Sequence, residues 1–157
     1  MPMILKAPGR TRPGQRGQGF TCHTLDLAPT LLEWMGAEIP DTLQGQSLWP
    51  LIAGEAQAGR DHVISSGNGQ QFGLYCQRML REERYKYIWN LTDADELYDL
   101  EQDPWELDNR IDDPALTATL ARMRRRLYEG LARARDPLAG MWTARQLLEG
   151  KKLGPRP

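Results

Sequence analysis

A helical stripe near the C-terminus is the sequence feature that most constrains the fold. Asp113 and Pro114 indicate a helix start, because an aspartate side chain accepts from free first-turn N–H groups and proline fits the first position. Apolar residues then step by four, three, four and four positions, at Leu116, Leu120, Met123, Leu127 and Leu131. This spacing predicts a long helix, ending before Asp136, with one apolar side that a second surface must cover.

Four strand candidates precede this helix and offer that surface. They are residues 62–66, 72–80, 85–89 and 95–100, with a turn at 81–84 that makes a hairpin of the second and third. In the third, Tyr85, Tyr87 and Trp89 alternate with Lys86 and Ile88, as expected for a sheet with one better-covered face. We therefore expect a small antiparallel sheet packed on the long helix, followed by one more short helix at 141–148.

The stretch from residue 23 to 53 predicts two shorter helices. Asp26 is expected to cap the first helix, and Pro29 falls where a missing N–H does little harm. Gly36 stands where a left-handed helix end is usual, and the second helix is expected to start near Ser47. The apolar stripe of the first helix is Leu27, Leu31, Leu32 and Met35.

The N-terminal residues predict a strand and a loop. Residues 2–5 have the character of a short buried strand that Pro8 and Gly9 stop. The basic segment 9–19 is rich in glycine and proline but lacks the spacing of a phosphate-binding loop, so we interpret it as a solvated loop.

Several blocks of residues resemble the later part of sulfatases, in the alkaline phosphatase superfamily. The first blocks are Pro-Met-Ile-Leu-Lys-Ala-Pro-Gly at 2–9, Asp-Leu-Ala-Pro-Thr-Leu-Leu at 26–32, Ile-Pro at 39–40 and Leu-Gln-Gly-Gln-Ser-Leu at 43–48. The later blocks are Arg-Tyr-Lys-Tyr-Ile at 84–88, Glu-Leu-Tyr-Asp-Leu at 96–100 and Asp-Pro-Trp-Glu-Leu-Asp-Asn at 103–109. They follow one another in the order that the family has.

The resemblance implies an α/β fold class: the C-terminal part of an alkaline phosphatase-like fold, with a small antiparallel sheet packed on a long C-terminal helix. Residues 1–59 would be the last part of the catalytic α/β domain, with the strand at 2–5 in its central sheet. Residues 60–138 would be the C-terminal subdomain and 139–157 a tail. The intact parent would hydrolyse a sulfate ester with a formylglycine nucleophile and a calcium ion.

The residues that carry this chemistry in the family have no counterpart in the chain. The formylglycine arises from the first residue of a Cys-x-Pro-Ser-Arg motif, whereas Cys22 is followed by His-Thr-Leu-Asp and Cys76 by Gln-Arg-Met-Leu. The paired acidic calcium ligands of the family also lie upstream of the matched blocks. We therefore expect no catalytic or metal-binding residue here, no activity of the chain alone, and a missing N-terminal part of the sulfatase as its partner.

Four residues are candidates for lining a substrate site. The loop before the first helix lies near the cleft in related sulfatases, which points to His23. If the family arrangement holds, the loop at 67–71 and the strand after it face the same cleft, which adds Asn68, Gln71 and Arg78. His62 is interpreted as an ordinary surface residue.

Two alternatives remain open from the sequence. A phosphonate monoester or phosphodiester hydrolase of the same superfamily would share these C-terminal blocks, because the discriminating groups lie upstream. A stand-alone binding or interaction module is the alternative of another class. The chain could be a truncation, a sequence with a misplaced start or one half of a split enzyme.

Charge and composition exclude some partners. Twenty basic and 21 acidic residues give a net charge of −1, which provides no field to attract nucleic acid. No apolar run reaches 18 residues and the N-terminus lacks signal-peptide character, so we expect no membrane span, and the localisation stays open. Ten acidic residues at 93–113 and six arginines at 122–135 are expected to pair with each other.

Overall fold

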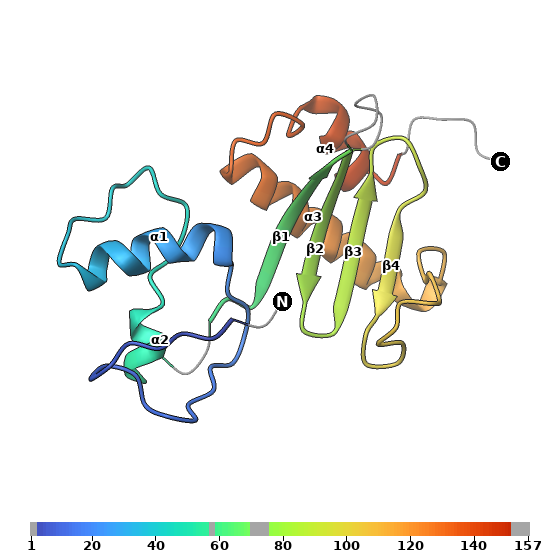
Figure 1. The fold of residues 1–157 in the computed structure, drawn as a ribbon. Helices are drawn as coiled ribbons and strands as arrows, with labels where there is room; N and C mark the ends of the chain where they lie inside the picture. Colours follow the sequence, from blue (N-terminus) through green and yellow to red (C-terminus); the bar gives the residue numbers. More distant parts are fainter. Residues whose placement is uncertain (1–2, 57–58, 70–75, 152–157) are drawn as a thin grey trace. The chain divides into compact units, whose positions relative to one another are not determined.

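The structure of the chain, a computed structural model, describes residues 3–56, 59–69 and 76–151 (Figure 1). The chain divides into two compact units, Met1–Val63 and Ile64–Pro157. The boundary after residue 59, which the resemblance implies between the catalytic domain and the C-terminal subdomain, stays a prediction. Among the described residues, no helix combines the length and the apolar character that crossing a membrane requires.

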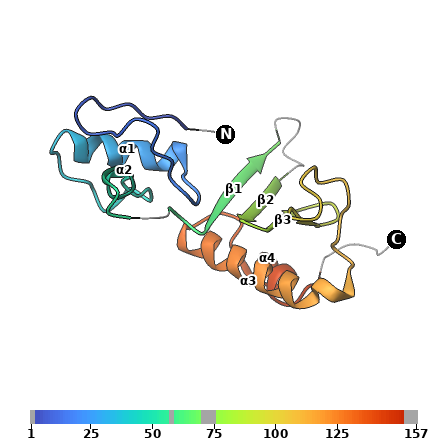
Figure 2. The same cartoon turned by 90° about the horizontal axis from the view of Figure 1, so that it is seen from below.

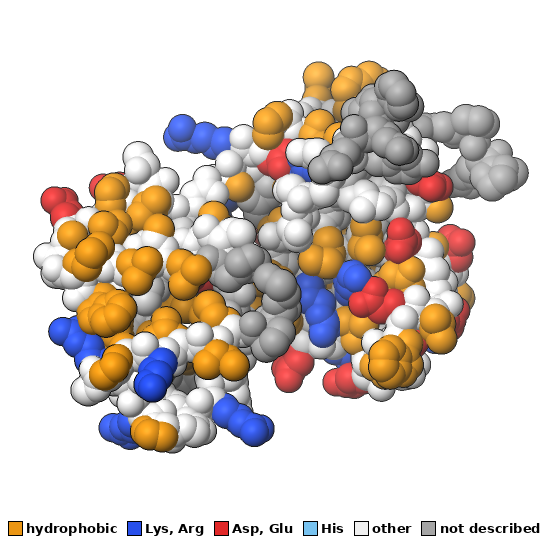
Figure 3. Space-filling view, in the orientation of Figure 1, with side chains coloured by type: hydrophobic (Ala, Val, Ile, Leu, Met, Phe, Trp, Pro, Cys, Tyr) orange, Lys and Arg blue, Asp and Glu red, His pale blue; other side chains and the backbone are white. Residues whose placement is uncertain are grey.

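The helix α1 (His23–Trp34) buries a polar side and exposes an apolar one. Asp26, Pro29 and Thr30 are buried, whereas Met35 just after the helix is 71% exposed. The other exposed apolar side chains of α1 are Leu25, Leu27, Leu31 and Trp34. Figure 3 shows hydrophobic side chains gathered on the surface of this unit over α1. The predicted stripe is therefore present, but most of it faces solvent.

The end of α1 and the start of α2 lie where the sequence predicts them. After α1, Gly36 adopts a left-handed conformation with φ of 69°. Its N–H donates to the carbonyl of Glu33, and the next N–H donates to the carbonyl of Leu32, which together cap the helix. The helix α2 (Trp49–Ala53) begins after Ser47, whose Oγ accepts from the Trp49 N–H at 3.2 Å.

The prediction that Asp26 caps α1 is wrong. The helix begins at His23, with Cys22 as its N-cap residue, so Asp26 lies inside the first turn. Its carboxylate accepts from the backbone N–H groups of Cys22, at 2.7 Å, and of Gln46, at 2.9 Å. Both of its oxygens also pair with the guanidinium of Arg60. A partner 34 residues away decides the role of this side chain, and no local pattern reveals such a partner.

Pro29 explains a close contact between α1 and the loop that follows it. Proline has no N–H to donate to the carbonyl of Leu25, four residues earlier. Gly45 lies beside that carbonyl, so close that a Cβ on residue 45 would be 1.9 Å from the oxygen. Only glycine fits at this position without a movement of the backbone.

The predicted strand at residues 2–5 is absent from the part that the structure describes. Residues 3–7 contain no strand, and the side chain of Ile4 is 93% exposed. A strand needs a neighbour to pair its backbone groups. In the described residues of this unit, strand-type pairing outside β1 is limited to one bridge between Phe20 and Arg60.

The second unit contains the predicted sheet. The strands β1 (His62–Asn68), β2 (Cys76–Glu82), β3 (Tyr85–Asn90) and β4 (Glu96–Asp99) lie in sequence order and alternate in direction (Figure 1). In the register, Tyr87 of β3 lies opposite Leu80 of β2 and Leu97 of β4. The strand β2 continues two residues into the predicted turn, and predicted strand residues 72–75 lie outside the described residues.

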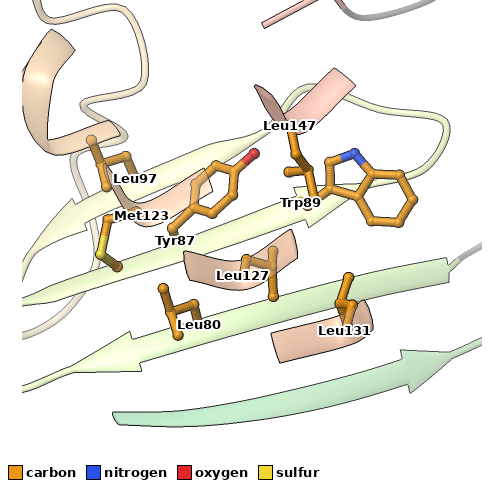
Figure 4. Packing of buried hydrophobic residues seen from close by; sticks show 8 residues of the cluster. All are labelled: Leu80, Tyr87, Trp89, Leu97, Met123, Leu127, Leu131 and Leu147. Atoms are coloured by element: carbon orange, nitrogen blue, oxygen red, sulfur yellow. The ribbon is translucent and has the colours of Figure 1, made fainter. Parts of the chain in front are cut away.

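The predicted long helix covers one face of this sheet. Asp113 accepts from the Ala115 N–H at 2.8 Å and starts the short helix η1 (Pro114–Leu116), which leads into α3 (Thr117–Arg133). Figure 2 shows α3 and α4 (Met141–Leu148) on the same side of the sheet. Figure 4 shows the core between these layers, formed by Leu80, Tyr87, Trp89, Leu97, Met123, Leu127, Leu131 and Leu147. The helical stripe and the alternation in β3 are both confirmed.

The predicted pairing between the acidic block and the arginines is confirmed for Arg124 and Asp95. Arg124 of α3 lies 3.3 Å from the carboxylate of Asp95, which also accepts from the Tyr87 hydroxyl at 2.8 Å. Arg122 and Arg126 instead pair with Glu82 of β2, which lies outside that block. The helix is thus held to the sheet by ion pairs at its side as well as by the core.

Candidate functional site

A buried arginine joins three segments at one end of the sheet. Arg78 of β2 is only 3% exposed. Its Nε and Nη2 donate to the two carboxylate oxygens of Asp136, at 2.8 and 3.1 Å. Its Nη1 donates to Oδ1 of Asn68 at 3.1 Å and to the carbonyl of Gln77 at 2.8 Å. One guanidinium therefore connects the end of β1, the strand β2 and the turn after α3.

The turn after α3 places Asp136 against this guanidinium. Arg135 has φ of 53°, a left-handed conformation that costs a non-glycine residue roughly 1–2 kcal/mol. The Asp136 N–H then donates to the carbonyl of Leu131, and Oδ1 of Asp136 accepts from the Leu138 N–H at 2.8 Å. Burial alone would raise the pKa of Asp136, but the hydrogen bonds from Arg78 and Leu138 outweigh it and hold that pKa below its ordinary value.

The structure brings together two of the four predicted substrate-lining residues. Asn68 and Arg78 are in direct contact. Gln71 lies outside the described residues. His23 is the first residue of α1, in the other unit, and its side chain is not part of what the structure describes. Sequence reasoning missed Asp136, because it is 58 positions from Arg78 and only its place beyond the helix end was predicted.

A second buried ion pair lies in the first unit, between Asp26 and Arg60. Burial alone would raise the pKa of Asp26, but the hydrogen bonds from Arg60, Gln46 and Cys22 outweigh it, so that pKa lies below its ordinary value. Each carboxylate oxygen accepts from one backbone N–H and one guanidinium nitrogen. This arrangement suits a scaffold contact that joins α1 to residues 46 and 60.

The described residues do not fit a calcium site. Nowhere in the described part of the chain do three His, Cys, Asp or Glu side chains come close enough together to hold a metal ion. The carboxylates of Asp26 and Asp136 are both committed to arginines. Neither Cys22 nor Cys76 begins the Cys-x-Pro-Ser-Arg motif from which formylglycine arises.

Comparison with known proteins matches the chain to one family. The family model described as N-sulphoglucosamine sulphohydrolase, C-terminal, matches residues 1–133. A relative from Bacteroides thetaiotaomicron, a Delta 4,5-hexuronate-2-O-sulfatase, is 34% identical over 140 residues. That match covers 87% of this chain and 29% of the relative.

Solved structures show the same likeness in three dimensions. A 2-O GAG sulfatase matches with a TM-score of 0.64 and 36% identity, over 72% of this chain and 25% of the other. The phosphonate monoester hydrolase of Agrobacterium radiobacter matches with a TM-score of 0.59 and 28% identity, over 69% and 24%. The chain thus spans less than a third of the length of these proteins, and its fold is the C-terminal part of an alkaline phosphatase-like fold. It belongs to the sulfatase family, as a C-terminal segment of the N-sulphoglucosamine sulphohydrolase type.

Proposed function

We propose that the chain is the C-terminal part of a hydrolase that cleaves sulfate esters of sugars, and that it works with a catalytic part that supplies the formylglycine nucleophile and the calcium ligands. The family membership supports the reaction class, and the name of the hexuronate sulfatase relative supports a sulfated sugar as the substrate. In this proposal the chain alone is inactive, because its sequence lacks the formylglycine motif and the residues that the structure describes form no metal site.

The observation that carries this proposal is the reversed burial of α1. A helix at the surface of a complete domain normally turns its apolar side inward. Here Asp26 and Thr30 are buried, whereas Leu27, Leu31 and Met35 are exposed. Such an apolar side needs a surface to cover it, and a catalytic α/β part, more than twice as long as this chain in the hexuronate sulfatase relative, offers one. The segment at residues 3–7, which pairs with no strand in the part of the chain that the structure describes, supports the same partner.

We propose that the predicted site residues contribute to the sugar-binding side of this enzyme. They are His23, Asn68, Gln71 and Arg78. In this proposal they bind the sugar or hold the side chains that bind it, while bond cleavage takes place on groups of the catalytic part.

The proposal is tested by comparing two polypeptides. The chain alone, with 4-nitrophenyl sulfate and calcium, should release no nitrophenol. A polypeptide that adds the catalytic part upstream of residue 1 should hydrolyse the ester. Turnover by the chain alone would overturn the assignment of the nucleophile to another part.

A phosphonate monoester hydrolase is the second candidate, because a solved enzyme of that kind matches at 28% identity. The longer polypeptide should then prefer 4-nitrophenyl phenylphosphonate to the sulfate ester. A stand-alone interaction module would instead behave as a stable monomer with a single sharp unfolding transition. Our proposal predicts self-association and dye binding through the exposed side of α1.

A further inference from the structure

We propose that Arg78 is a positioning residue that turns the side-chain amide of Asn68 outward, so that its nitrogen donates to an oxygen of the bound sugar. The proposal rests on the sugar sulfatase function proposed above. It gives Asn68 and Arg78 different roles, where the sequence suggested that both line the substrate.

The direction of the Asn68 amide follows from the chemistry of its partner. A guanidinium has five N–H donors and no acceptor. The Asn68 atom that faces Nη1 of Arg78, 3.1 Å away, must therefore be the carbonyl oxygen. The amide nitrogen then points away from Arg78. Asn68 is exposed at the end of β1, and among the described residues none accepts from this nitrogen.

Arg78 itself is poorly placed to contact a ligand. Four of its five N–H groups donate to protein atoms, two to Asp136 and one each to Asn68 and Gln77. At most one N–H remains, on a side chain that is 4% exposed. A sugar at this end of the sheet would meet the amide of Asn68 before it reached the guanidinium.

Asp136 keeps the arginine from rotating. Two parallel hydrogen bonds to one carboxylate fix the plane of a guanidinium as well as its position. Asp136 is in turn fixed by the Leu138 N–H and by the left-handed turn at Arg135. The order of support therefore runs from the turn after α3, through Asp136 and Arg78, to the amide of Asn68.

The chemistry of this amide selects the ligand group. A neutral N–H donor binds an acceptor oxygen, which a sulfated hexuronate offers as hydroxyl, carboxylate or sulfate. Asn68→Asp separates the proposed role from a structural one. The aspartate still accepts from Arg78, but it has no donor to offer and adds a negative charge that repels an anionic sugar.

Binding is measured on the full chain with an unsaturated disaccharide that carries a 2-O-sulfated hexuronate. The side-chain amide signals of Asn68 should shift in a ¹⁵N–¹H titration at millimolar sugar. Asn68→Asp and Asn68→Ala should each weaken binding at least about tenfold, as the loss of one hydrogen bond to a charged group would. Asp136→Asn, which loosens Arg78, should weaken it less. Ser66→Ala, at an exposed position on the same strand, is the matched control and should bind as the wild type does.

Two results would overturn this role. One is a titration in which the Asn68 signals do not move. The other is an Asn68→Asp variant that binds the sugar as the wild type does, at an equal or higher melting temperature, since a purely structural link to Arg78 predicts that outcome. Turnover of 4-nitrophenyl sulfate by the longer polypeptide separately tests the proposed function. If turnover is present but Asn68→Asp leaves the KM for the sulfated disaccharide unchanged, the role of Asn68 fails and the sulfatase function stands.

Discussion

Asparagine at position 26 should destabilise the first unit far more than the loss of a helix cap would. The Asp26 carboxylate is buried and accepts two backbone N–H groups and two guanidinium nitrogens. In Asp26→Asn, Arg60 loses its counter-charge. The new side-chain NH2 group also faces N–H donors that need an acceptor. Removing one partner of a buried ion pair costs about 3–5 kcal/mol. Because the Arg60 side chain retains 18% exposure, we expect about 3 kcal/mol.

This magnitude separates the two roles of Asp26. The loss of an N-cap side chain costs about 1 kcal/mol and involves no distant partner. If Asp26 acts through the ion pair, Arg60→Ala should destabilise the unit by a similar amount to Asp26→Asn. The double variant should then be destabilised by much less than the sum of the two. If Asp26 acted only as a helix cap, Arg60→Ala should change the free energy of unfolding by less than about 0.5 kcal/mol.

Hydrogen exchange of the backbone N–H groups of α1 and of residues 45–60 is the suitable assay, because it reports the opening free energy of this unit separately. Asp41→Asn, which removes an exposed carboxylate from the same unit, is the control. A cost of about 1 kcal/mol for Asp26→Asn, additive with Arg60→Ala, would refute the reasoning.

The same pair predicts the acid sensitivity of the unit. The pKa of Asp26 is lowered in the folded state, so its contribution is complete above the ordinary aspartate pKa of about 4 and is lost as the pH falls through the lowered value. Protection in α1 should therefore decline below about pH 4. Asp26→Asn should flatten this decline. An unchanged pH profile in that variant would contradict the assignment.

Three further substitutions test separate contacts. Leu127→Ala, in the core of the second unit, should lower the free energy of unfolding by about 2–5 kcal/mol in urea denaturation. Gly45→Ala places a Cβ 1.9 Å from the carbonyl oxygen of Leu25 and should lower the melting temperature clearly, whereas Gly140→Ala, with nothing within 4 Å, should not. Leu31→Gln, on the exposed side of α1, should reduce self-association of the chain in sedimentation while changing the free energy of unfolding by about 0.5 kcal/mol or less.

The second unit could be predicted from sequence because the apolar side of its long helix is covered by the sheet of the same unit. The alternation in β3 and the stripe of α3 face each other, so the period of each pattern agrees with the surface that covers it. The turn and cap residues also act locally, as Asp113 does on the Ala115 N–H. Local pattern and tertiary packing therefore point to the same structure.

The first unit could not be predicted as well, and the reason is physical. The apolar character of α1 and of residues 3–5 indicates surfaces to be covered, but the described residues of the first unit itself do not supply the cover. The buried partners of α1 are polar instead, as Asp26 with Arg60 and Thr30 with the Leu48 N–H show. Such pairs depend on residues 18 to 34 positions away, for which a helical pattern carries no signal.

Two residues of the cluster around Arg78 could be named from the sequence, but the third, Asp136, could not. The resemblance to sulfatases pointed to Asn68 and Arg78, and the structure places them in contact. It could not show that Arg78 is buried against Asp136, because the turn that brings Asp136 there depends on a left-handed residue, Arg135, of a type that rarely adopts this conformation.

The DNA that precedes the codon of Met1 tests the central claim most directly. If the chain is the C-terminal part of a sulfatase, that DNA should encode a Cys-x-Pro-Ser-Arg-like run, either in the same reading frame or in the neighbouring gene. A closed reading frame, with no such run in that frame or in the neighbouring gene, would contradict the claim that a catalytic part works with this chain.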